Sequence, residues 1–88
     1  MDNIPRILSV AAITSTQLYV VFHDGSKRVY DCQPLLDRER FHHLKNCGFF
    51  RTVHVDAGGY GISWNDNIDL SEYELWTNGK PAAETSSF

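Results

Sequence analysis

One stretch, from Gln17 to Cys32, constrains the fold of this chain more than any other. Its first half, up to His23, carries apolar residues on both faces of an extended chain: Leu18, Val20 and Phe22 on one face, Tyr19 and Val21 on the other. Apolar side chains on both faces are typical of a central strand rather than an edge strand. The second half, from Lys27, reads as the partner strand.

The dipeptide Asp24-Gly25 lies between these two strands. It predicts a two-residue β-hairpin loop, because both central positions of such a loop must tolerate positive φ. A loop of this length would place Val20 opposite Val29 and Tyr19 opposite Tyr30. Each such cross-strand pair stabilises a sheet by roughly 0.2–1 kcal/mol.

The middle of the chain predicts a short helix between strands. Asp37 suits the N-cap of a helix from Arg38 to about Cys47, and Gly48 suits the left-handed position that closes a helix. The buried stripe of this helix would consist of Phe41, Leu44 and Cys47. The further strands expected are Arg6 to Ile13, Phe49 to Val55 with either Phe49 or Phe50 inward, and Gly59 to Asn65.

The C-terminal helix has the clearest boundaries. Ser71 to Glu74 matches a capping box, in which the Ser71 hydroxyl accepts the amide of the third helical residue and Glu74 reaches back to the Ser71 amide. Asn78-Gly79 ends the helix, and Pro81 prevents its continuation.

These elements predict an α+β fold: a small antiparallel sheet of about four to five strands, a short middle helix and a C-terminal helix. The 88 residues suit one domain, which we place at 5–80, followed by a flexible tail at 81–88.

The composition is that of an ordinary soluble domain, 42% hydrophobic and 22% charged. No apolar run reaches the roughly 18 residues that a membrane span needs, and the start lacks the apolar segment of a signal peptide. We therefore expect a cytoplasmic protein, with Cys32 and Cys47 as reduced thiols.

The glycine-rich segment Asp56 to Gly61 is typical of a turn, because Asp bonds to the backbone ahead of it and Gly adopts positive φ. A phosphate-binding loop needs G-x-G-x-x-G between a strand and a helix, whereas here the spacing differs and a strand follows. Loops carry most binding residues. The candidate interaction surface is therefore Tyr60, Trp64, Asn65 and Asp66, with core packing of Trp64 beside Trp76 as the alternative.

Several stretches together resemble the bacterial family catalogued as domain of unknown function 2442: PRILSV, VVFHDGSKRVYD, QPLL and VHVDAGGYGISWNDNIDLSEYELWTNG. The similarity runs from about Pro5 to Lys80; Ala57 stands where the family usually has proline. The resemblance implies a small α+β fold and brings no established catalytic residues. It also implies an accessory or regulatory role, since similar proteins occur alone, fused to helix-turn-helix domains, or beside another small gene in cassettes resembling toxin–antitoxin pairs.

Metal and enzyme chemistry have weak sequence support. His43 and Cys47 have a suitable i, i+4 spacing, and Cys32, His42 and His54 could join them, but a structural zinc site usually shows two close ligand pairs. Cys47 near a helix C-terminus would be poorly activated, because reactive thiolates favour helix N-termini or cationic neighbours. No cofactor is expected.

Nucleic-acid binding is an alternative. The net charge is −3, but the segment from Arg38 to His54 is basic. The candidate phosphate contacts are Arg38, Arg40, Lys45 and Arg51. No nucleic-acid-binding motif accompanies them.

The function we expect is therefore that of a non-catalytic regulatory or adaptor domain that binds a small protein partner, encoded by an adjacent gene, or a second copy of itself. The alternatives are a nucleic-acid-binding regulator that uses the basic helix Arg38-Lys45, and a small enzyme or metal-binding protein.

Overall fold

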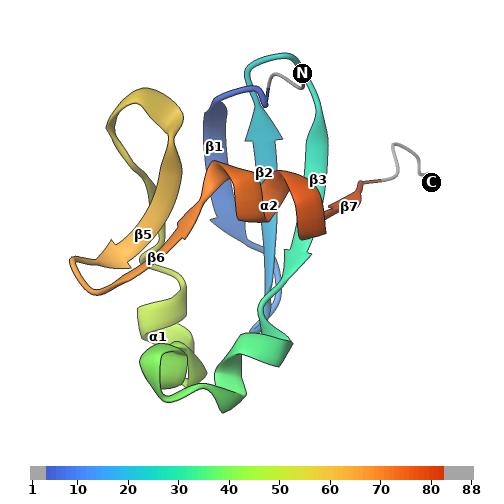
Figure 1. Cartoon of the computed structure of the whole chain (residues 1–88). Helices are drawn as coiled ribbons and strands as arrows, with labels where there is room; N and C mark the ends of the chain where they lie inside the picture. Colours follow the sequence, from blue (N-terminus) through green and yellow to red (C-terminus); the bar gives the residue numbers. More distant parts are fainter. Residues whose placement is uncertain (1–3, 83–88) are drawn as a thin grey trace.

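The computed structural model describes residues 4–82, which form two antiparallel sheets and several short helices (Figure 1). The four-stranded sheet has the order β1-β2-β3-β7, with bounds Ile7–Ala12, Gln17–Phe22, Lys27–Asp31 and Lys80–Pro81. The three-stranded sheet has the order β4-β5-β6, with bounds His54–Val55, Gly61–Asn65 and Ile68–Ser71. The predicted α+β class is confirmed, although the strands are divided between two sheets instead of one.

The β2–β3 hairpin has a three-residue loop, so the predicted register was wrong by one residue. Phe22 N–H donates to Ser26 O at 2.8 Å, and Gly25 in the loop adopts a positive φ, of 92°. The Asp24 carboxylate accepts the Ser26 N–H at 2.8 Å, which stabilises the longer loop. Tyr19 therefore faces Val29 instead of Tyr30.

The middle segment differs from the predicted helix over Arg38 to Cys47. It consists of the 3₁₀ helices η1 (Gln33–Asp37) and η2 (Glu39–Lys45), followed by the short helix α1 (Cys47–Phe50). Arg38 and Asn46 are extended and separate these pieces, and the Asn46 side chain caps α1 by accepting the Phe49 N–H at 2.9 Å. Phe41 and Leu44 are buried as predicted, because their i, i+3 spacing also places them on one side of a 3₁₀ helix.

The strand predicted for Phe49 to Val55 is mostly wrong. Phe49 and Phe50 belong to α1, Gly48 lies inside α1 instead of closing a helix, and only β4 is extended. Phe50 is the phenylalanine that enters the core, while Phe49 is only partly buried.

Helix α2 (Glu72–Asn78) follows β6 and crosses one face of the four-stranded sheet (Figure 1). The Ser71 cap is as predicted, since its Oγ accepts the Glu74 N–H at 3.1 Å. The Glu74 carboxylate does not reach back to Ser71, because it accepts hydrogen bonds from Tyr30 and Asn78.

The helix ends at Asn78 as predicted, and the chain then pairs with β3. Pro81 lies opposite Arg28, and Ala82 N–H donates to Lys27 O at 3.0 Å. Residues 81 and 82 of the expected tail therefore extend the sheet. The rest of that tail, 83–88, lies outside the described residues. No helix in the described part of the chain is long and apolar enough to cross a membrane.

Replacing Ser71 with alanine should lower the free energy of unfolding by about 1 kcal/mol, because the Glu74 amide loses its capping acceptor. Urea unfolding would measure this change. Thr77→Ala, an exposed position of the same helix, is the control and should change stability by less than about 0.5 kcal/mol. Equal losses of stability in the two variants would mean that the Ser71 cap makes no specific contribution to stability.

Candidate functional site

The glycine-rich segment is a tight structural loop, as its composition predicts. It contains the short 3₁₀ helix η3 (Ala57–Gly59), in which Gly58 and Gly59 adopt φ of 83° and 75°. A Cβ atom on Gly59 would lie 2.6 Å from the carbonyl oxygen of Ile7, and one on Gly61 would lie 2.7 Å from that of Leu70. The glycines therefore let the loop pack closely against β1 and β6.

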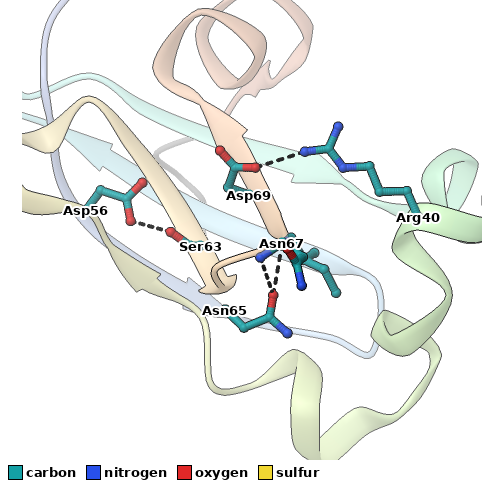
Figure 2. A network of polar contacts seen from close by, with 7 residues as sticks. Arg40, Asp56, Ser63, Asn65, Asn67 and Asp69 are labelled. Atoms are coloured by element: carbon teal, nitrogen blue, oxygen red, sulfur yellow. Dashed lines mark hydrogen bonds and ion pairs between the residues drawn. The ribbon is translucent and has the colours of Figure 1, made fainter.

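Asp56 stabilises the base of this loop through two hydrogen bonds (Figure 2). Its carboxylate accepts a hydrogen bond from the Ser63 hydroxyl, and its N–H donates to Gly61 O at 2.9 Å. The Asp56 carboxylate and N–H thus hold the β5 end of the loop in place.

The four residues of the candidate interaction surface do not form one surface. Tyr60 is 56% exposed, and the Arg6 guanidinium lies 3.9 Å from the centre of its ring. Trp64 is only 5% exposed, so it is not available to a partner. Its Nε1 donates to Phe50 O at 2.8 Å and its ring stacks on that of Phe50, while the suggested neighbour Trp76 instead contacts Phe22.

Asn65 and Asp66 are exposed in the turn between β5 and β6. The Asn65 side chain accepts the N–H groups of Asn67 and Ile68, at 2.8 and 2.9 Å (Figure 2). This arrangement is an Asx turn, so Asn65 has a structural role that does not require a ligand.

The four candidate nucleic-acid contacts are all exposed, but they lie in three different surroundings. Arg38 and Lys45 line one depression together with His42 and His43, and Asp37 and Glu39 line it as well. Arg40 pairs with Asp69 at 3.0 Å (Figure 2), and Arg51 lines a separate depression beside the end of β1. The structure therefore brings together only two of these four cations.

The cysteines and histidines are placed as follows. Cys47 is exposed at the first residue of α1, so it does not belong to the buried stripe and does not lie near a helix C-terminus, as had been expected. Cys32 is buried, and this burial, together with the Asp31 charge, raises its pKa to about 12, so the thiol stays protonated. Among residues 4–82, no group of three or more His, Cys, Asp or Glu side chains could hold a metal ion.

One face of the four-stranded sheet was not recognised from the sequence. The side chains of β2 alternate between buried and half-buried, and the buried set lies on the face covered by α2. The opposite face, which we call the open face, carries Ser9, Ala11, Tyr19, Val21 and Val29, none of which is buried. The apolar residues on both faces of β2 predicted a central strand, and β2 does lie between β1 and β3. They did not show which face of the sheet is left open.

The profile of the family described as "Protein of unknown function (DUF2442)" matches residues 7–81. The chain belongs to this family. The match begins at the first residue of β1 and ends at the last residue of β7, so the family unit corresponds to both sheets, including the short β7 strand. No curated protein and no solved structure matches this sequence closely enough to report.

This DUF2442 chain also has a cavity of about 520 Å³ beside β3, which we call the β3-edge cavity. Its residues come from β2, β3, η1, α2 and β7, together with Arg38: Gln17, Val29, Tyr30, Asp31, Pro34, Leu35, Arg38, Glu74, Asn78 and Lys80. Tyr30 O–H donates to Glu74 Oε2 at 2.7 Å, and Asn78 Nδ2 donates to the same oxygen at 3.0 Å.

The Tyr30 hydroxyl remains protonated at neutral pH. Burial raises the pKa of Tyr30 well above its ordinary value, and the hydrogen bond and negative charge of Glu74 raise it further, while the positive charge of Arg38 acts in the opposite direction. Tyr30 is therefore a fixed donor that orients Glu74 toward the cavity.

Proposed function

We propose that this protein is a non-catalytic regulatory or adaptor domain that binds a small protein partner through the open face. The observation that carries the proposal is the open face itself: Tyr19 and Val21 lie on the central strand β2, yet neither is buried. Tyr19, Val21 and Val29 are half-buried, so solvent still reaches them. A contiguous apolar surface that solvent reaches marks an interaction site more often than isolated apolar residues do.

The layout of the open face resembles that of a protein interface. Tyr19 lies between Ala11 and Val29 on the neighbouring strands, so an apolar row crosses the sheet. Charged residues surround this row: Lys27, Asp31 and Lys80. An apolar centre with a polar rim, and a tyrosine at the centre, is the usual anatomy of an interface.

The partner we propose is the product of an adjacent small gene, in a pair that resembles toxin–antitoxin cassettes. The family resemblance supports this choice, since similar proteins are encoded in that arrangement. A partner with an apolar strand or helix face could lie against β1, where Ser9 and Ala11 offer only small side chains.

The test is affinity capture of the tagged protein from its native cells, with mass spectrometry of the bound proteins, in wild type and two variants. Val21→Lys places a charge at the centre of the open face and should reduce the captured partner by at least about tenfold. Tyr73→Lys is the matched control, because Tyr73 is exposed on α2, on the other side of the sheet. Thermal unfolding would establish that both variants are folded.

Equal capture by the two variants would contradict the proposed surface, and a wild-type protein that retains no partner would contradict the function. Nucleic acid that co-purifies and dissociates as salt rises would instead favour the alternative, a nucleic-acid-binding regulator. The observation that favours this alternative is that Arg38 and Lys45 line one depression, which Asp37 and Glu39 also line.

A further inference from the structure

We propose that the β3-edge cavity binds a small zwitterion of the α-amino-acid class with an apolar side chain. This cavity shares Val29 with the open face and Asp31 and Lys80 with its charged rim, but Tyr19 and Val21 at the centre of that face do not line it. The inference does not rest on the proposed protein partner. The proposal combines four features of the cavity: an unpaired stretch of strand edge, an oriented carboxylate, two cations and an apolar wall.

The strand edge comes from β3 beyond the end of β7. Cys32 N–H donates to Thr16 O at 2.7 Å, on the β2 side of the strand. Because backbone groups in an antiparallel strand alternate in direction, the N–H and C=O of Asp31 point to the opposite edge. β7 pairs only with Arg28 and Val29, so the backbone of Asp31 is left facing the cavity.

The oriented carboxylate is that of Glu74. Its Oε2 accepts both the Tyr30 hydroxyl and the Asn78 amide, whereas no hydrogen bond of Oε1 is found within residues 4–82. The carboxylate is thus fixed in place while one oxygen can still accept a donor from a ligand. A ligand ammonium group would form charge-assisted hydrogen bonds there.

The two cations are Arg38 and Lys80, which line the same cavity. Neither forms an ion pair in the described part of the chain, where the salt bridge found joins Arg40 to Asp69. A guanidinium group suits a carboxylate because it offers paired N–H donors in one plane. The cavity therefore presents two cations beside two anions, Asp31 and Glu74.

This balance of charges favours a zwitterion over an anion or a cation. A simple anion would be repelled by Glu74 and Asp31, and a simple cation by Arg38 and Lys80. Val29, Pro34 and Leu35 supply an apolar wall for the side chain of the ligand. The volume of about 520 Å³ is within the range of small-molecule sites.

The first test uses the wild-type protein and three probes: L-leucine, N-acetyl-L-leucine and L-leucinamide. Titrations followed by ¹H–¹⁵N NMR should show saturable shifts of the Asp31 and Asn78 amides with L-leucine, with a Kd below about 1 mM. Each of the other two probes lacks one charge and should bind at least about tenfold more weakly.

Two variants then test which residue binds each charged end of the ligand. Arg38→Gln should weaken L-leucine at least about tenfold but leave L-leucinamide unchanged, because the amide does not need the guanidinium. Glu74→Gln should weaken L-leucine and leave N-acetyl-L-leucine unchanged. Arg40→Gln is the matched control, since Arg40 is a nearby arginine that does not line the cavity, and it should bind L-leucine like the wild type.

Either of two results would overturn this proposal. One is the absence of saturation by L-leucine at about 10 mM, and the other is equal affinity for all three probes. Because the probes are compared on the unaltered protein, this outcome does not depend on how well a variant folds. The variant Val21→Lys separates the two proposals: it should reduce capture of the protein partner by at least about tenfold and leave L-leucine binding unchanged.

Discussion

Replacing Gly59 with alanine should lower the free energy of unfolding by about 2–5 kcal/mol. Gly59 adopts a φ of 75°, where an alanine is strained by about 1–2 kcal/mol. The added Cβ would also lie 2.6 Å from Ile7 O and 3.0 Å from Ile7 N, so the loop or β1 would have to move. Urea unfolding monitored by tryptophan fluorescence would measure the change.

Gly25→Ala is the matched control for this prediction. Gly25 also has a positive φ, of 92°, but a Cβ there would meet no atom within 4 Å. Gly25→Ala should therefore lower the free energy of unfolding only by the backbone strain, about 1–2 kcal/mol. If both variants lost the same stability, the close approach of the glycine-rich loop to β1 would be contradicted.

Replacing Phe50 with alanine should lower the free energy of unfolding by about 3–5 kcal/mol. The Phe50 side chain is completely buried and its ring stacks on Trp64 at a centroid distance of 6.0 Å. Its loss would leave a cavity between α1 and β5, because the neighbouring side chains can fill that space only in part. A domain with a stability in the ordinary range of about 5–15 kcal/mol would lose a large share of it.

Phe49→Ala provides the comparison, because Phe49 is the neighbouring residue of the same type. Phe49 is only partly buried, and the centre of its ring lies 6.1 Å from the centre of the His43 ring. Its truncation should lower stability by less than half as much as that of Phe50. A larger effect at Phe49 than at Phe50 would show that α1 is oriented differently from the structure described.

Local sequence patterns predicted the elements whose signals depend on a few adjacent residues. Ser71 caps α2 and Asn78-Gly79 ends it as predicted, because capping is decided by side chains within one helical turn. The glycine-rich loop was also recognised, since positive φ is a local requirement. The hairpin between β2 and β3 was predicted as well, but its register was wrong because Ser26 N–H bonds to Asp24 and lengthens the loop.

The elements that were wrong are those decided by contacts between distant segments. The segment from Arg38 to Cys47 has apolar spacing compatible with an α-helix, yet Asn46 interrupts it. Phe50, predicted to lie in a strand, instead belongs to α1 and stacks on Trp64. Glu74 does not complete the capping box, because its carboxylate accepts a hydrogen bond from the hydroxyl of Tyr30, which lies 44 residues earlier in the chain. Local sequence shows neither that Trp64 contacts Phe50 nor that Tyr30 donates to Glu74.

For the candidate sites, sequence reasoning identified residue types and the fold decided their use. Tyr60 and Trp64 were both placed on the candidate interaction surface, with core packing as the alternative for Trp64, and the structure exposes the first and buries the second. The apolar residues of β2 were recognised, while the fact that α2 covers only one face could not be, because it depends on the number and placement of the helices.

The sequence by itself determined the α+β class, the family, the helix cap and the glycine loop, because each is encoded by neighbouring residues or by the pattern of the whole chain. Only the tertiary structure decided that the strands form two sheets, that the open face is left uncovered, and that Arg38, Glu74 and Lys80 line one cavity. These features arise from segments far apart in the chain, and burial and hydrogen bonding of the whole molecule fix their relative positions.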